Sequence, residues 1–239
     1  MIPVSDTVRS RTTPYVNVAL IAANVLVFLY ELALSQGEIN RFFFDHGVVP
    51  RELVHWVNDP SGLGQPLTVI SAAFIHGGWL HILGNMLYLW VFGDNVEDAL
   101  GHLRYLFFYL VAAAGAVTLQ VWVDQDSGIP MVGASGAIAG VLGAYLVLYP
   151  KATVSVVIPW FWFFGAFPMP AVFLIGFWFV LQLFSGIAAI GTATGVSEGV
   201  AVWAHVGGFL TGFAIVLALR PLIPRRSLPS PRRPRRRMW

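Results

Sequence analysis

The sequence contains no cysteine and very little charge. Without cysteine there is no disulfide, no thiolate nucleophile and no cysteine-based metal site to consider. Charged residues make up 11% of the 239 residues, hydrophobic residues make up 57%, and the mean hydropathy is +0.72. A water-soluble domain of this length needs a larger share of polar residues. The composition therefore excludes a soluble globular protein and indicates an integral membrane protein.

Several apolar stretches have about the length of roughly 20 residues that a helix needs to cross a bilayer. They lie at 14–34, 79–98, 103–123, 133–150, 170–190 and 200–220. We therefore predict an all-α fold, a polytopic bundle of six transmembrane helices. The apolar region 154–190 is longer than one span, but Pro159, Pro168 and Pro170 interrupt its first half. Because proline breaks helices, we expect a hydrophobic loop there, followed by one span.

The basic residues are distributed unevenly. Twelve of the 14 Lys and Arg residues fall on one predicted side of the membrane, and eight of them lie at or beyond the end of the last span. Basic residues mark the cytoplasmic side, so both termini are predicted to be cytoplasmic, in what we expect to be a bacterial plasma membrane. The chain then divides into a cytoplasmic N-terminal segment (1–13), a membrane domain (14–220) and a basic, Pro/Arg-rich disordered cytoplasmic tail (221–239).

The tail has too few apolar residues to fold, and we expect it to anchor the topology and to contact anionic membrane lipid. Nucleic acid is not expected as a partner, because the tail has neither interleaved aromatic residues nor a folded binding module. The first loop, 35–78, contains hydrophobic groups at 42–44 and 54–56 among charged residues. This mixture favours short amphipathic helices in the membrane interface. A lid or a partner surface is the alternative.

Four polar side chains are predicted to lie at one depth of the membrane. With the N-terminus in the cytoplasm, the second, fourth and sixth spans begin on the outer side. His81 and Asn85 lie in the first turns of the second span, Ser135 opens the fourth, and His205 is near the start of the sixth. A rise of 1.5 Å per residue puts each within about 10 Å of the outer end of its helix. Polar groups are unfavourable in hydrocarbon, so this layer indicates a functional site near the outer face.

Ser135 lies in the motif Gly133-Ala134-Ser135-Gly136 at a helix start. A serine in a membrane helix ordinarily bonds to a carbonyl one turn earlier, and a lone Gly-x-Ser-Gly is a weak signal. At a helix start, however, unpaired N–H groups and the positive end of the dipole favour developing negative charge. The missing side chain of Gly133 would also let a substrate backbone approach.

His205 could be a helix–helix hydrogen bonder, a proton relay or a general base, and Ser135 offers it a partner. Small residues allow helices to approach closely, and they recur on both spans. They are Gly208 and Gly212 on the sixth span and Gly136, Gly140 and Gly143 on the fourth. Such an approach would bring the hydroxyl and the imidazole within the hydrogen-bond distance that base-activated attack requires.

His81 and Asn85 are four residues apart and so share one helical face. As a structural pair they would bond to loop carbonyls. Alternatively, they would donate hydrogen bonds to the oxyanion of a tetrahedral intermediate, together with the Ser135 N–H. His76 lies off this face, and we expect it to brace the loop.

These motifs resemble those of the rhomboid intramembrane serine proteases. The segments that match are His76-Gly-Gly-Trp-Leu-His81-Ile-Leu-Gly-Asn85, Gly133-Ala-Ser135-Gly136 and Ala204-His205-Val-Gly-Gly208-Phe-Leu-Thr-Gly212, in the family's order. The resemblance covers about 14–220 and excludes the tail. It implies a six-span rhomboid-like protease domain, a Ser135/His205 dyad without an acidic third member, and an oxyanion site that uses His81 and Asn85. It further implies that the substrates are transmembrane segments of other proteins, cut near their outer ends, and that no metal or organic cofactor is required.

The sequence departs from the family pattern in two places. Leu67-Thr68 stands where a Trp-Arg pair is often found in the first loop, and Ala139 stands one turn after the serine, where some members stack an aromatic ring on the histidine. The orientation of the imidazole must then come from helix packing or from a different ring. The hydrophobic segment 160–180 is a candidate gate for a substrate helix that enters sideways, although its apolar residues would equally suit passive lipid contact.

Two alternatives to a protease stay open. The first is a non-catalytic rhomboid-like protein that binds membrane clients, although binding alone needs none of the four polar residues. The second is a transporter or proton channel with His81 and His205 as relays. That function needs a polar pathway across the whole bilayer, whereas the polar residues thin out towards the cytoplasmic halves of the fourth and sixth spans. The sequence names neither the physiological substrate nor the oligomeric state.

Overall fold

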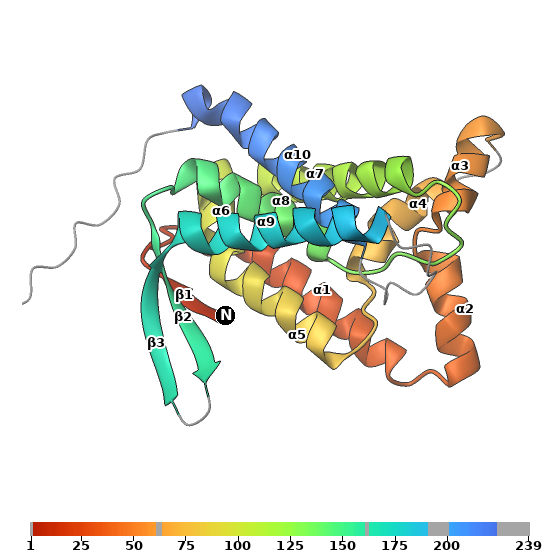
Figure 1. The fold of residues 1–239 in the computed structure, drawn as a ribbon, viewed down its shortest axis with the longest axis horizontal. Helices are drawn as coiled ribbons and strands as arrows, with labels where there is room; N and C mark the ends of the chain where they lie inside the picture. The colour runs from red at the N-terminus through yellow and green to blue at the C-terminus, as the bar shows by residue number, and fades with distance from the viewer. Residues whose placement is uncertain (1, 61–63, 161–162, 191–200, 224–239) are drawn as a thin grey trace, which may run out of the picture.

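A computed structural model describes residues 2–60, 64–160, 163–190 and 201–223. Most of these residues are helical, and a three-stranded sheet lies at one end of the helices (Figure 1). The helices are α1 (Tyr15–Glu31), α2 (Gln36–His46), α3 (Pro50–Asn58), α4 (Gly64–Ser71), α5 (Trp79–Tyr88), α6 (Asp94–Leu100), α7 (His102–Val123), α8 (Ser135–Leu148), α9 (Ala171–Ile190) and α10 (Val202–Leu219), with the short turns η1 (Ala72–Phe74), η2 (Leu89–Gly93) and η3 (Arg220–Leu222).

Each predicted membrane stretch contains an apolar helix. Within the described residues, two helices are long and apolar enough to cross a membrane, namely His102–Val123 and Val202–Leu222. A third span results if Gly64–Phe74 and Trp79–Leu100, which are bent by 83° at their junction, are taken together. The helices α1, α8 and α9 are apolar but shorter by the same test. The predicted count of six spans is therefore not confirmed, and it stays a prediction.

Burial in the bundle follows the sequence pattern of small residues. α8 is buried along nearly its whole length, including Gly136, Gly140 and Gly143. It packs against α7 and α10, while α9 covers α8 and α10 on another side (Figure 1). A helix that is apolar on every side belongs in the centre of a bundle, so α8 forms the central element of the site described below.

A buried carboxylate connects α1 to α6. Glu97 on α6 is fully buried, and its carboxylate accepts hydrogen bonds from the backbone N–H groups of Val16 and Asn17, at 3.1 and 2.7 Å. The first N–H groups of a helix lack intrahelical partners and carry partial positive charge, so the carboxylate caps α1 from a different helix. The carboxylate of Glu97 also contacts Nδ1 of His102.

A sheet forms where the sequence predicts an irregular hydrophobic loop. The strands β1 (Ile2–Asp6), β2 (Thr153–Trp160) and β3 (Phe163–Pro170) pair antiparallel in the order β1-β2-β3. Figure 1 shows the β2–β3 hairpin extending sideways from the bundle. The all-α prediction omits this sheet, and the predicted separate N-terminal segment (1–13) contributes one of its strands.

The prolines that suggested a loop are compatible with these strands. Pro168 lies on β3, an edge strand of the described sheet, and edge strands tolerate proline because some of their residues point the backbone nitrogen away from the sheet. Pro159 lies beyond Val157, the last β2 residue that pairs with β1. β-Branched residues supply most of the paired part of β2, and such residues suit a half-buried pleated strand.

The first loop contains α2, α3 and α4, as the sequence predicts. Ser35 and Glu38 form a capping box at the start of α2. Val48 then pairs with Met131 in an isolated antiparallel bridge, which ties this loop to the segment before α8. Contact of these helices with lipid stays a prediction. The predicted basic tail lies almost entirely outside the described residues, which end at Ile223.

Candidate active site

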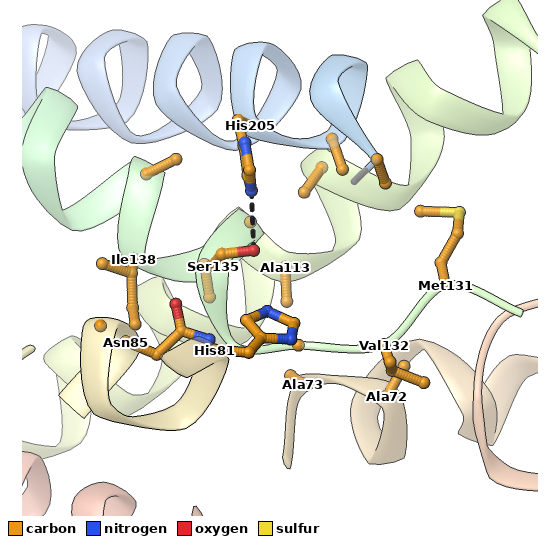
Figure 2. Close-up of a pocket in the computed structure, with 18 of the residues that line it drawn as sticks. Ala72, Ala73, His81, Asn85, Ala113, Met131, Val132, Ser135, Ile138 and His205 are labelled. Carbon is orange, nitrogen blue, oxygen red and sulfur yellow. Dashed lines mark hydrogen bonds between the residues drawn. The ribbon is translucent and has the colours of Figure 1, made fainter. Parts of the chain in front are cut away.

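Ser135 and His205 lie in direct contact. The Ser135 hydroxyl oxygen is 2.7 Å from Nε2 of His205, and Figure 2 shows the two side chains pointing toward each other from α8 and α10. Ser135 is the first residue of α8, and His205 lies in the first turn of α10. Both side chains are half-buried. This distance is within the range for a hydrogen bond between a hydroxyl and an imidazole.

Glycines make this contact possible. A Cβ on Gly208 would lie 1.9 Å from the carbonyl oxygen of Gly136, and a Cβ on Gly212 would lie 2.1 Å from that of Gly140. No side chain fits at such distances, so α8 and α10 touch backbone to backbone along this seam. The predicted close approach of the two helices is therefore confirmed.

His81 lies against the loop that precedes Ser135. A Cβ on Gly133 would be 2.7 Å from the ring atoms Cε1 and Nε2 of His81 and 3.6 Å from the Ser135 hydroxyl. The φ of Gly133 is +128°, a conformation that favours glycine. The backbone N–H of Gly77 donates to Nδ1 of His81 at 3.4 Å. Because Nδ1 accepts, Nε2 carries the proton and can act as a donor on the side that faces Gly133.

Asn85 is held by a histidine for which the sequence predicted only a bracing role in the loop. Asn85 is buried, and its Nδ2 lies 2.9 Å from Nε2 of His76. His76 is also buried, and its backbone N–H donates to the carboxylate of Glu31 at 3.1 Å. Burial lowers the pKa of His76 to about 4, so the ring is neutral near pH 7 and Nε2 can accept from the amide. His76 therefore braces the loop and also orients Asn85.

The four predicted residues line one cavity of about 860 Å³. His81 and Asn85 lie on one side of Ser135, and His205 lies on the other (Figure 2). Apolar residues form much of the remaining wall, among them Ala113, Met131, Ile138 and Trp178. An apolar cavity with a few convergent polar groups has the character of a binding site for an apolar segment of a ligand. The structure thus brings the four residues together at one cavity, and their common depth in the membrane stays a prediction.

Sequence reasoning missed three residues that hold α10 and its histidine. Oε1 of Gln182 on α9 is 2.9 Å from Nδ1 of His205, and the Trp178 ring lies 5.8 Å from the imidazole, centroid to centroid. Oε1 of Gln120 on α7 accepts from the backbone N–H of Ala204 at 3.2 Å. Lone glutamines in long apolar helices were the available signal, since polar groups in a membrane require partners.

Comparison with known proteins identifies the family to which this chain belongs. A family model described as the Rhomboid domain matches residues 63–222, which is more than half of the chain. The chain belongs to the rhomboid family. Rhomboid proteins are integral membrane proteins, and they are generally intramembrane serine proteases that act on transmembrane substrates.

Individual rhomboid relatives share about a third of their aligned residues with this chain. RHOMBOID-like protein 4 of Arabidopsis thaliana is 32% identical over 162 residues, which cover 64% of this chain and 34% of that protein. RHOMBOID-like protein 2 of the same plant is 34% identical over 159 residues, with coverages of 66% and 44%. The putative rhomboid protease YdcA of Bacillus subtilis (strain 168) is 32% identical over 105 residues, with coverages of 43% and 52%. The chain thus spans between about a third and half of the length of these relatives.

Proposed function

We propose that this rhomboid protein is an intramembrane serine endopeptidase that cleaves transmembrane segments of other membrane proteins. The observation that supports this proposal most directly is the 2.7 Å contact between the Ser135 hydroxyl and Nε2 of His205. A non-catalytic client-binding protein needs no such pair, and a serine without an adjacent base is a weak nucleophile.

The first chemical step is attack on the scissile carbonyl. Nε2 of His205 takes the proton of the Ser135 hydroxyl as a new bond forms between Oγ and the carbonyl carbon. The carbonyl oxygen then bears the negative charge of the tetrahedral intermediate. The backbone N–H of Ser135, at the start of α8, has no intrahelical partner and can donate to this oxygen. The side chains of His81 and Asn85 complete the set of donors.

Collapse of this intermediate breaks the C–N bond. The imidazolium of His205 gives its proton to the leaving amine, which departs with the carboxyl-terminal fragment, and an ester between Ser135 and the amino-terminal fragment of the substrate remains. A water molecule then attacks the ester carbonyl while His205 again takes a proton. Return of that proton to Oγ releases the acid and restores the enzyme. His205 thus acts once as a base and once as an acid in each half of the reaction.

The proposal includes a topology. The helices α8 and α10 begin away from the β1–β2–β3 sheet, and the carboxyl end of α10 lies on the same side of the bundle as the sheet (Figure 1). With the basic residues in the cytoplasm, both termini are cytoplasmic and the site is near the outer face of a bacterial plasma membrane. A substrate helix would then be cut near its outer end. The substrates are transmembrane proteins, and the surrounding partner is membrane lipid.

Cleavage assays in liposomes test this function. The purified chain is incubated with a panel of single-span proteins, and the products are identified by mass spectrometry. We expect cleavage by the wild type and none by Ser135→Ala or His205→Ala. The controls are Ser185→Ala and His55→Ala, which change the same residue types at exposed positions. A fluorophosphonate probe should label the wild type at Ser135.

Two outcomes would contradict the proposal, the first its nucleophile and the second its protease function. Cleavage that persists in Ser135→Ala would exclude the proposed nucleophile. If neither the wild type nor the variants cleave, and all of them bind the same clients equally, the chain is a client-binding rhomboid protein.

A further inference from the structure

The two ring nitrogens of His205 contact different helices. Nε2 is 2.7 Å from the Ser135 hydroxyl on α8, and Nδ1 is 2.9 Å from Oε1 of Gln182 on α9. The imidazole therefore bridges two neighbours, and both of its polar atoms have partners. Buried polar atoms are normally paired in this way, because a lost partner leaves an uncompensated desolvation penalty.

The partner at Nδ1 selects the protonation state of the ring. A neutral imidazole carries one proton, and a base at Nε2 requires that proton to reside on Nδ1. The oxygen of a carboxamide accepts hydrogen bonds and cannot donate them. Oε1 of Gln182 therefore favours the tautomer with Nδ1–H, which leaves the Nε2 lone pair directed at Ser135.

The same helix also restricts rotation of the ring. Position 139, one turn after Ser135, holds a buried alanine, so α8 presents only a methyl group there. Trp178 lies one turn before Gln182 on α9, with its ring 5.8 Å from the imidazole at an interplanar angle of 44°. The tryptophan and the glutamine thus contact the imidazole from one helix face.

We propose that Gln182 is a positioning residue for His205: its carboxamide oxygen holds the imidazole in the tautomer and rotamer that accept the Ser135 proton. This role rests on the proposed protease function and deepens it. An amide in this place carries no charge, so it orients the base without the ionic stabilisation that a carboxylate would give to an imidazolium. His81 on α5 is another ionisable side chain that lines the same cavity, and it does not change in the variants below.

Gln182→Leu and Gln182→Glu test the role. Leucine keeps approximate volume but loses the acceptor, and we expect kcat to fall about tenfold to a hundredfold while KM stays within about twofold. Glutamate keeps an acceptor and adds charge, so kcat should stay within about tenfold of the wild type. Its acidic limb in the kcat/KM pH profile should move to higher pH, because the carboxylate stabilises the imidazolium. Gln125→Leu is the control, since Gln125 lies in an exposed turn.

A second readout does not depend on catalysis. In protein labelled with 15N-histidine, a difference spectrum against His205→Ala identifies the His205 ring nitrogens. We expect the wild-type ring to show the Nδ1–H tautomer, and Gln182→Leu to show loss of that preference at an unchanged melting temperature. A wild-type level of kcat in Gln182→Leu, together with an unchanged tautomer, would overturn the role of Gln182. If the wild type shows no Ser135-dependent cleavage, the protease function fails, and the nitrogen shifts still decide whether Gln182 orients the ring.

Discussion

Gly208 on α10 rests on the backbone of Gly136 on α8, and a Cβ on Gly208 would lie 1.9 Å from the Gly136 carbonyl oxygen. Ser135 is adjacent to Gly136, and His205 is one turn before Gly208 on its helix. The distance between the hydroxyl and the imidazole therefore depends on this backbone contact. A single methyl group added at this contact should therefore change both the separation of α8 and α10 and the proposed reaction of Ser135.

Gly208→Ala is expected to lower stability and activity together. The added methyl group forces α10 away from α8, and overpacking of this kind typically costs about 1–3 kcal/mol. Cleavage should fall at least about tenfold, because a shift of about 1 Å between reacting groups can cost up to a hundredfold. The measurements are the thermal midpoint in detergent and kcat. Gly176→Ala on α9 is the control, because its Cβ meets no atom within 4 Å. An active Gly208→Ala protein with an unchanged thermal midpoint would contradict the assigned role of the seam.

Gly133→Ala should lower kcat by a larger factor than it lowers the folding equilibrium constant. Its φ of +128° disfavours a side chain, and the new Cβ would lie 2.7 Å from the His81 ring. The ring must therefore move away from the position in which it can donate to the oxyanion, and we expect kcat to fall about a hundredfold. Gly101→Ala is the control for backbone strain without a clash, because Gly101 has a φ of +85° but a Cβ there would meet no atom within 4 Å. If the two variants lose activity equally, His81 is not the cause.

His76 and Asn85 should act as one unit. Asn85→Ala removes a proposed oxyanion donor, and such changes cost about a hundredfold to a thousandfold in kcat. His76→Ala leaves the donor but removes the partner 2.9 Å from it, so we expect a smaller loss of about tenfold. In the double variant the loss should equal that of Asn85→Ala alone, because His76 acts through Asn85. His55→Ala on the exposed surface of α3 is the control. Additive losses in the double variant would show that His76 works through another contact.

The stability of the end of the bundle that carries the β1–β2–β3 sheet should depend on pH through Asp6. The pKa of Asp6, on β1, is raised from 3.8 to about 6, chiefly because burial disfavours its charged form, although the Tyr145 hydroxyl donates to it. Since the folded state favours the protonated acid, this contribution to stability is fully present below pH about 4 and is lost as the pH rises through 6. Asparagine at position 6 cannot ionise. The unfolding free energy of the wild type minus that of Asp6→Asn should therefore decrease by roughly 1 kcal/mol as the pH rises over that window.

Melting curves in detergent between pH 4 and 7.5 measure this difference. The exposed Asp59→Asn provides the matched variant, and its difference from the wild type should stay level over the same window. If the unfolding free energy of the wild type instead increases relative to that of Asp6→Asn as the pH rises, the folded state stabilises Asp6 as a carboxylate and the prediction is wrong.

Local pattern was sufficient to predict the apolar helices. Apolar runs near span length placed α1, α5 to α10 within a few residues, because helix formation in a membrane depends on local hydrogen bonds and on hydrophobicity. Glycine spacing predicted the α8–α10 seam for the same local reason. The sheet was not predictable in this way: β1 and β2 are about 150 residues apart in the chain, and their pairing depends on how the bundle brings them together.

Composition by itself determined that the chain is a membrane protein, and charge and helical rise predicted that Ser135, His205, His81 and Asn85 share one depth. Only the tertiary structure decided which groups hold them: Gln182 and Trp178 on α9 for His205, His76 for Asn85, and Glu97 for the start of α1. Each of these contacts joins elements whose relative rotation is a property of the whole packed bundle. Residue spacing predicts which side chains share one face of a helix. Which side chains from other elements contact that face depends on packing and on the need of every buried polar atom for a partner.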